Sequence, residues 1–394
     1  MKIGILTLPL HVNYGGILQC YALQTVLKRM GHDVTLLSST WASDKDMLKL
    51  RIKNSWKHVA NILFGYNYTY IPTKREERIL RQHISKFIAN HLEPRTKPLH
   101  TTKEYQEQCL NDGFDALIVG SDQVWRPRYT PSVTDYYLKF VENEKTIKRI
   151  AYAASFGTDE WEYSKEETEE CRQLIKKFDA VSVREHGGVY LCKEHYDIEA
   201  VQTLDPTMLL ECADYKSLVA LEKEEKCSGT LFSYILDPTD EKQELAEKLS
   251  TSLSLVPFGC IPTKSKRVRA NVRKCIDECT YPPVTQWIRS FMDAEMVITD
   301  SFHGCVFSIL FNKPFWVIGN EGRGISRFSS LLATFGLQDR MIMPGESPEW
   351  NKKIDWDKVN EIRQREKERS IQFLYSSLSR YHTTRIIDKI FPCL

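Results

Sequence analysis

The sequence predicts an α/β protein with two parallel β-sheets, and three observations lead to this fold class. Short apolar segments typical of buried strands alternate with segments of helical periodicity along most of the chain. The first repeat, from Lys2 to Leu37, has the order strand–helix–strand, which implies parallel strands joined by a right-handed crossover. The pattern restarts at Leu231, and 394 residues exceed what one hydrophobic core usually organises. We therefore expect two such units.

The first unit is predicted from strands that alternate with helices. It opens with a strand at Lys2–Leu8 and a polar loop at His11–Gly16. A helix at Ile17–Met30 follows, which ends at Gly31, and then a second strand at Val34–Leu37. Residues 41–110 are rich in cations and aromatic residues, and we expect helices that leave the sheet there. A charged helix is expected at Lys165–Lys177, and the remaining strands at Phe114–Val119, Ile150–Ala154, Ala180–Val183 and Val201–Leu204.

The second unit has the same alternation. Its strands are predicted at Leu231–Leu236, Leu255–Phe258, Met296–Thr299 and Phe315–Ile318. One helix is expected to follow an N-cap at Asp237 with Pro238 in the first helical position. Further helices are predicted at Val284–Phe291, Cys305–Phe311, Ser326–Phe335 and Asp355–Tyr381.

These elements together predict a GT-B-like architecture, in which two Rossmann-like domains with parallel sheets face a central cleft. The last helix is expected to return to the first domain. We place the N-terminal domain at 1–210, the C-terminal domain at 211–345 and the returning helical segment at 346–394.

Composition excludes several classes of function. The net charge of +2 gives no reason to expect nucleic-acid binding. The eleven cysteines are scattered, which predicts reduced thiols in a cytoplasmic protein, and they form no pattern that predicts a metal site. The N-terminal strand lacks the features of a signal peptide. Since no segment approaches the roughly 18 apolar residues of a membrane span, we expect any membrane association to be peripheral.

His303 is the strongest candidate for a functional residue. It follows the predicted strand Met296–Thr299, and ligands of open α/β sheets bind beyond the carboxyl ends of strands. The helix that begins there offers backbone N–H groups to an anion. A histidine can gain or lose a proton near neutral pH. The neighbours expected to bind substrate with it are Asp300, Ser301, Phe302 and Gly304.

Five stretches in a fixed order carry a resemblance to a known family. They are Asn13–Gly16 with Leu18–Gln24, Gly120–Trp125, Tyr152–Gly157, Ser182–Glu185 and Thr299–Gly304. In this order they resemble the polysaccharide pyruvyl transferase family, from residue 1 to about 340. The resemblance implies a GT-B-like fold and transfer of pyruvate from phosphoenolpyruvate, as a ketal, onto two hydroxyls of a sugar. It implies no cofactor, an acceptor side in the N-terminal domain and a donor side in the C-terminal domain.

Phosphoenolpyruvate is a small, dense anion, so its binding requires cations. Arg184 follows the strand Ala180–Val183, and its guanidinium can bind a carboxylate or a phosphate in bidentate geometry. The structural alternative is a surface arginine paired with Glu185. The family pattern also has an arginine here. His303 could bind the phosphate or act as the general acid. Arg323 and Arg327, near a glycine-rich helix start, are expected to be further anion ligands or to serve the fold.

Several residues leave a functional and a structural interpretation open. Asp122 could be the general base for the acceptor hydroxyl or cap a turn. Trp125 could stack on a sugar ring or belong to the core. The glycines of the first loop permit close approach of a ligand or form a tight turn. The remaining substrate-binding candidates are Asn13, Tyr14, Gly15, Gly16, Gly120, Ser121 and Gln123.

Residues 261–274 hold six cations and no acid. One interpretation of this segment is a solvated loop. The other is a contact for a lipid-linked oligosaccharide acceptor or for an anionic membrane face. If the segment makes such a contact, we expect the protein to lie at the inner face of the membrane.

Two other functions remain open. A GT-B glycosyltransferase that uses a nucleotide sugar would share the architecture, with Asp300 as a ribose-binding acid. A protein that binds sugar or anions without turnover would bind phosphoenolpyruvate and release no phosphate.

Overall fold

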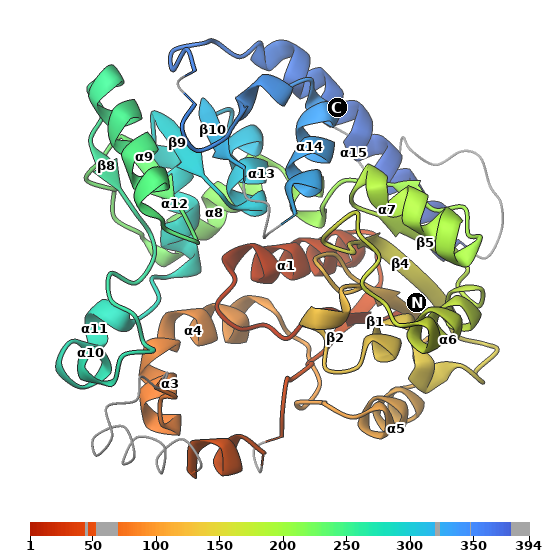
Figure 1. Ribbon diagram of the computed structural model, residues 1–394. Coiled ribbons are helices and arrows are strands. Elements are labelled where there is room, and N and C mark those ends of the chain that lie inside the picture. The colour runs from red at the N-terminus through yellow and green to blue at the C-terminus, as the bar shows by residue number, and fades with distance from the viewer. Residues whose placement is uncertain (44–45, 53–69, 320–323, 347, 380–394) are drawn as a thin grey trace.

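The computed structural model describes residues 1–43, 46–52, 70–319, 324–346 and 348–379. Two parallel sheets form its framework, and Figure 1 shows the second sheet above the first with helix α1 (Tyr14–Arg29) between them. The strand order is β2-β1-β3-β4-β5-β6 in the first sheet and β11-β10-β9-β7-β8 in the second. All neighbouring strands in both sheets are parallel. The predicted α/β class with two Rossmann-like units is confirmed.

The first sheet is covered by helices on both faces. Its strands are β1 (Lys2–Leu6), β2 (Asp33–Leu37), β3 (Ala116–Val119), β4 (Lys148–Ala154), β5 (Ala180–Val183) and β6 (Val201–Gln202). Its helices besides α1 are α3 (Lys74–Leu80), α4 (Gln82–His91), α5 (Thr102–Asp112), α6 (Lys165–Ile175) and α7 (His186–Leu191). Apolar side chains of α1 and α4 pack on one face, and those of α5 and α6 pack on the other. Burial on both faces explains why β3 is apolar throughout.

The second sheet is built in the same way. Its strands are β7 (Leu231–Tyr234), β8 (Pro257–Phe258), β9 (Met296–Thr299), β10 (Phe315–Ile318) and β11 (Met341–Ile342). Its helices are α8 (Cys212–Glu222), α9 (Asp240–Leu253), α10 (Arg269–Lys274), α11 (Ile276–Cys279), α12 (Val284–Asp293), α13 (Phe302–Leu310) and α14 (Ile325–Phe335). Apolar residues of α12, α13 and α14 share one continuous core with α1, so the two units are packed together.

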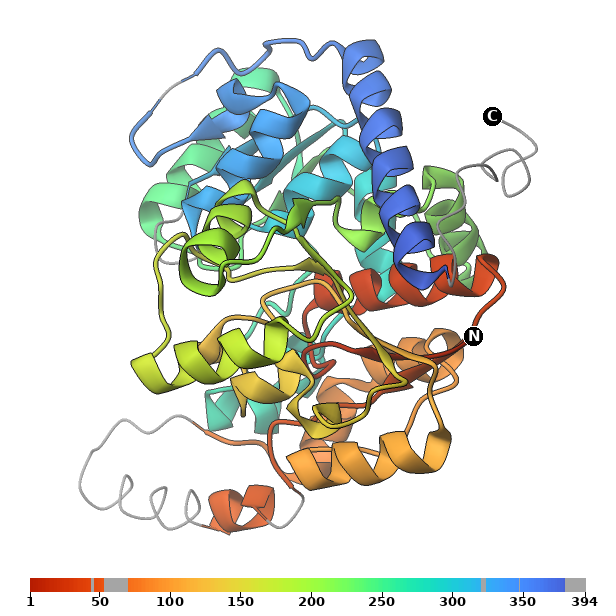
Figure 2. The ribbon, with the colours of Figure 1, turned by 90° about the vertical axis from the view of Figure 1, so that its right-hand side faces the viewer.

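The last described helix, α15 (Trp356–Leu378), returns to the first unit as predicted. Figure 2 shows it running from the second unit to the level of α1. The Lys148 ammonium at the start of β4 donates to the carbonyls of Ser377 and Ser379, each at 3.0 Å. The exact domain boundaries at 210 and 345 stay predictions.

Three helix starts differ from the expectation. Helix α1 begins at Tyr14 and α13 at Phe302, so both glycines of the first loop and His303 lie in first turns of helices. Helix α9 begins after Thr239, whose hydroxyl accepts from the Lys242 N–H, and Asp237 is not its N-cap. Helices α1 and α13 begin earlier than predicted because the first turn of a helix carries little apolar periodicity, whereas α9 begins later than predicted.

The described residues contain neither a membrane-spanning helix nor a cluster of metal ligands. No helix among them is long and apolar enough to cross a membrane. They also hold no group of three or more His, Cys, Asp or Glu side chains that could bind a metal ion.

Candidate active site

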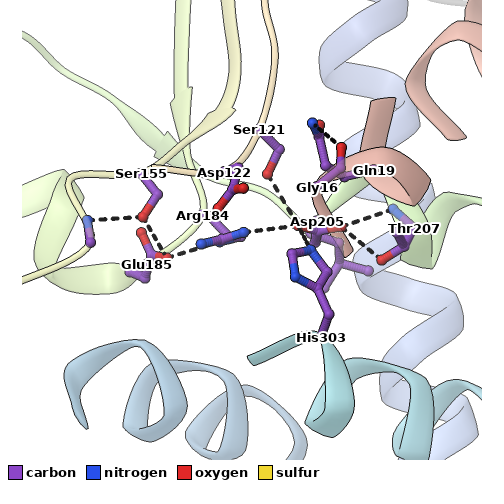
Figure 3. A network of polar contacts seen from close by, with 12 residues as sticks. Gly16, Gln19, Ser121, Asp122, Ser155, Arg184, Glu185, Asp205, Thr207 and His303 are labelled. Atoms are coloured by element: carbon purple, nitrogen blue, oxygen red, sulfur yellow. Dashed lines mark hydrogen bonds and ion pairs between the residues drawn. The ribbon is translucent and has the colours of Figure 1, made fainter. Parts of the chain in front are cut away.

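The carboxyl ends of strands from both sheets meet at one place. Asp122 follows β3, Arg184 follows β5, Asp205 follows β6, and His303 lies on α13 directly after β9. Figure 3 shows Asp205 between Arg184 of the first unit and His303 of the second. Parallel strands end at the same edge of a sheet, and this brings together residues that are far apart in the sequence.

Asp205 is the centre of this network. Its side chain is buried, and its Oδ1 accepts from the Thr207 N–H at 3.0 Å and from the Thr207 hydroxyl at 2.7 Å. Its Oδ2 accepts from the Ser121 hydroxyl at 3.1 Å. Burial alone would raise the pKa of Asp205, but the charges of His303 and Arg184 and these hydrogen bonds outweigh it, so the pKa lies below its ordinary value.

Arg184 is held between two carboxylates. Its Nη1 donates to Asp205 Oδ2 at 3.0 Å, and its Nε donates to Glu185 Oε1 at 2.9 Å. Burial would lower the pKa of Arg184, but the two carboxylates raise it, so the guanidinium stays charged. Its Cζ lies 4.0 Å from the centre of the Phe302 ring. Its buried Nη2 has no hydrogen-bond partner among the described residues.

The His303 ring lies against the first turn of α1. Its Nε2 is 3.4 Å from Asp205 Oδ2, an ion-pair distance, and makes no hydrogen bond with the described residues. A Cβ atom on Gly15 would lie 2.0 Å from His303 Cγ and 2.1 Å from Nδ1. Only glycine allows the imidazole this close to the helix, and this explains the first glycine of the pair.

Asp122 lies on the other side of the same turn. Its backbone has a positive φ of 74°, a left-handed conformation that aspartate tolerates better than most residues. Its Oδ2 accepts from the Asn13 amide at 3.3 Å. A Cβ atom on Gly16 would lie 3.3 Å from this carboxylate. The Asn13 side chain makes no capping hydrogen bond to α1, whose first-turn N–H groups therefore need another partner.

Arg327 brings a second buried guanidinium to the site. It lies in α14 of the second unit, and its pKa is lowered to about 10, mainly by burial and then by the charge of Arg184. A Cβ atom on Gly324 would lie 2.2 Å from the Gly157 carbonyl, so the start of α14 touches the first unit. The other predicted anion ligand, Arg323, lies outside the described residues.

A pocket borders the site at the seam between the two units. Arg184, Asp205 and Phe302 line it together with residues of β6 and the segment after it, of α14 and of α15: Gln202, Thr203, Leu204, Leu331, Thr334, Glu366 and Arg369. The buried Arg184–Asp205 pair therefore has an opening beside it.

Two predicted substrate-binding aromatic residues belong to the core. The Tyr14 hydroxyl donates to the Pro282 carbonyl at 2.9 Å, and its ring stacks on Trp287. Trp125 is fully buried, its indole N–H donates to the Tyr136 carbonyl, and its ring stacks on Tyr137. Both side chains are therefore buried in the core of this structure, and for Trp125 this is the alternative that the sequence left open.

The residues around His303 have mainly local roles. Both oxygens of Asp300 accept from protein groups, from the N–H groups of Leu236 and Asp237 and from the Lys242 ammonium at 2.6 Å, so its predicted roles in substrate or ribose binding stay predictions. The Ser301 hydroxyl caps α13 by accepting from the Gly304 N–H. A Cβ atom on Gly304 would lie 2.3 Å from Thr299 Oγ1, so this glycine serves helix–strand packing.

The other residues predicted to bind substrate in the turn after β3 are Gly120, Ser121 and Gln123. Ser121 donates to Asp205, as described above. The Gln123 side chain accepts from Arg126 at 3.1 Å and lies against Gly157. Gly120 is in ordinary van der Waals contact with Leu23 and has no close approach that requires glycine.

Sequence reasoning missed Asp205 as a site residue and named Glu185 only as a pairing partner of Arg184. Both follow strands, and Glu185 also accepts from the Ser155 hydroxyl at 2.9 Å. The signal for Asp205 was present, because Asp205-Pro206 follows the apolar segment Val201–Leu204. The rule that drew attention to His303 applies equally to this position.

Comparison with known proteins agrees with this geometry. The family model of polysaccharide pyruvyl transferase matches residues 13–322, well over half of the chain. The chain belongs to the polysaccharide pyruvyl transferase family. It is therefore a transferase, and the matched range includes Asp122, Arg184, Asp205 and His303. No curated protein matches the sequence.

Solved structures resemble this pyruvyl transferase family member in fold. Arabidopsis thaliana UGT89C1 complexed with UDP-L-rhamnose has a TM-score of 0.51 at 10% identity, over 95% of this chain and 98% of that one. The UDP-GlcNAc 2-epimerase from Methanocaldococcus jannaschii has a TM-score of 0.50 at 10% identity, over 95% and 99%. At such identity the likeness shows the shared GT-B-like fold alone.

Proposed function

We propose that this protein transfers pyruvate from phosphoenolpyruvate onto two hydroxyls of a sugar, in a cell-surface polysaccharide or its lipid-linked precursor. The family supports the reaction class. The observation that carries the proposal is the meeting of Arg184 and His303, from different units, at the buried carboxylate of Asp205.

The donor is expected to bind between the cations of the two units. The lowered pKa of Arg327 means that the folded protein holds this buried charge at a cost, partly because Arg184 is a like charge. An anion bound near both guanidinium groups would offset the repulsion between them and favour their charged forms. Phosphoenolpyruvate, with a phosphate and a carboxylate, fits two cations better than a single-charge ligand does.

The chemistry requires one general acid and one general base. In our proposal His303 protonates the methylene carbon of phosphoenolpyruvate, so the carbon–carbon π bond becomes a C–H bond and the neighbouring carbon becomes electrophilic. A sugar hydroxyl attacks that carbon as Asp122 accepts its proton. The second hydroxyl then displaces phosphate and closes the ketal, and its proton leaves with the phosphate.

A thermal-shift titration tests the donor. The ligands are phosphoenolpyruvate, inorganic phosphate and UDP-N-acetylglucosamine, and the proteins are wild type, Arg327→Gln, His303→Gln and the control Lys248→Gln, a half-exposed residue paired with Glu244. A ligand present at a hundredfold excess over its Kd stabilises the folded state by about 2.7 kcal/mol. We expect phosphoenolpyruvate to stabilise wild type and the control, and Arg327→Gln much less.

The same titration can contradict the proposal. Stabilisation by the UDP-sugar with no response to phosphoenolpyruvate would favour the glycosyltransferase alternative. Binding of phosphoenolpyruvate without phosphate release across a panel of sugar acceptors would favour a protein that binds without turnover.

We also propose a peripheral contact with an anionic membrane through residues 261–274. Three of the six cations contact protein groups: Lys264 pairs with Glu278, Lys266 with Glu77, and Arg269 lies over the Tyr70 ring. The other three, Arg267, Arg273 and Lys274, are exposed beside the half-exposed Val268. Exposed cations next to an apolar side chain are suited to lipid headgroups.

Vesicle sedimentation tests this contact. Wild type should bind vesicles that contain phosphatidylglycerol and not vesicles of phosphatidylcholine alone, and binding should weaken with salt. Replacing Arg267, Arg273 and Lys274 by glutamine should abolish it, whereas Lys248→Gln should not. Equal binding by the triple variant would contradict the proposal.

A further inference from the structure

Asp205 has a set of partners that no other acid of the site shares. It is 2% exposed and receives hydrogen bonds from Ser121, Arg184 and Thr207 of the first unit. The same Oδ2 that accepts from Arg184 also faces His303 Nε2 of the second unit at 3.4 Å. One oxygen atom therefore connects the guanidinium to the imidazole.

The carboxylate cannot easily turn away from the histidine. Oδ1 is held by both the N–H and the hydroxyl of Thr207, and Thr207 follows Pro206 in a short 3-10 helix, Pro206–Leu209. Oδ2 is held by Ser121 and Arg184. With all other sides occupied, Oδ2 presents a fixed negative charge to the Nε2 side of the imidazole.

We propose that Asp205 is a positioning residue that keeps the proton of His303 on Nε2 and leaves Nδ1 as the nitrogen that exchanges a proton with substrate. A carboxylate beside one ring nitrogen favours the tautomer with the proton on that nitrogen, and it also stabilises the imidazolium ion. Nδ1 lies on the edge of the ring that packs near Gly15 in the first turn of α1, together with Cγ.

This role of Asp205 rests on the proposed function. It also specifies which nitrogen of His303 gives its proton to phosphoenolpyruvate. Phosphoenolpyruvate must present its methylene carbon to Nδ1 of the His303 ring. In the transfer, the Nδ1–H bond breaks and a C–H bond forms, and His303 is left neutral with its proton on Nε2. Arg184 is fixed by the same oxygen, so a change at Asp205 disturbs the donor clamp and the acid together.

Nitrogen-15 NMR of protein labelled in its histidines tests the proposal without any substrate. The His303 signals are assigned by their loss in His303→Gln. In wild type we expect the neutral ring to carry its proton on Nε2. In Asp205→Asn we expect a mixture of the two tautomers. The control is Asp300→Asn, a buried acid three residues from His303 whose partners are Leu236, Asp237 and Lys242.

The outcomes separate this role from the reaction itself. A wild-type His303 with its proton on Nδ1 would overturn the proposal even if Asp205→Asn did not fold, and so would an unchanged tautomer in a folded Asp205→Asn. Where transfer is measured, Asp205→Asn should lower kcat and shift the pH profile, and Asp300→Asn should shift neither. A protein that transfers no pyruvate but shows the expected tautomer would contradict the proposed function alone.

Discussion

Asp205 and Asp300 are both fully buried aspartates that come just after strands, yet their surroundings differ. The partners of Asp300 are Leu236, Asp237 and Lys242, all in the second unit. The partners of Asp205 come from both units, and two of them, Arg184 and His303, are candidate functional residues. Asp300 holds the β7–α9 loop against β9, whereas Asp205 joins the two units at the site.

The comparison shows that position alone does not decide the role of a polar residue after a strand. A carboxylate whose donors all belong to one unit stabilises that unit. A carboxylate shared between units orients groups that must meet during a reaction. Four experiments separate the two roles.

The largest expected effect is a loss of activity when His303 is replaced. His303 is a partner of Asp205 and not of Asp300. His303→Gln removes the proposed general acid, and we expect pyruvyl transfer to fall by about 10²–10⁴-fold. Phosphate release from phosphoenolpyruvate in the presence of acceptor measures this effect. A variant with at least a tenth of wild-type activity would show that His303 only binds or orients the donor.

The next largest effect is a loss of stability when Asp300 is replaced. Asp300→Ala leaves the Lys242 ammonium buried without its partner, and breaking such a pair costs about 3–5 kcal/mol. Urea denaturation measures the loss. The double variant Asp300→Leu with Lys242→Met should recover most of it, because the unpaired charge is gone. If the double variant is as unstable as the single one, hydrogen bonds to Leu236 and Asp237 matter more than the charge.

Gly15→Ala tests how closely the His303 ring must approach α1. The added Cβ would lie 2.0 Å from His303 Cγ, so the ring must move from its position beside Asp205. A displacement of this kind can cost about 10²-fold in rate. Gly259→Ala is the control, since its Cβ would meet only the Ser233 carbonyl at 3.5 Å. Equal activity of both variants would contradict a fixed ring position.

The smallest effect is the dependence of stability on acid. The folded-state pKa of Asp205 is below its ordinary value, so its carboxylate stabilises the fold above the unfolded-state pKa of about 4. This contribution is lost as the pH falls through the folded-state pKa. Asp205→Asn should therefore lose less stability than wild type between neutral and acidic pH, as measured by denaturant midpoints. Parallel pH curves would contradict the lowered pKa.

Much of the fold was predictable, because strands buried on both faces must be apolar. Strands β5, β9 and β10 have the predicted bounds. Local periodicity also predicted helix α12, whose Trp287, Ile288 and Phe291 are buried. Helix starts were less predictable, since Tyr14–Gly16 and Phe302–His303 form first turns whose residues are chosen for contacts with other segments.

The sequence by itself determined the two-unit α/β architecture and marked Arg184 and His303, because strand ends and residue chemistry are local properties. Only the tertiary structure decided that Tyr14 and Trp125 belong to the core, that Asp300 is saturated and that Asp205 is the shared acid. Those roles depend on which distant segments supply the hydrogen-bond donors. Asp205 and His303 are 98 positions apart, and their contact exists only after both units have folded and packed.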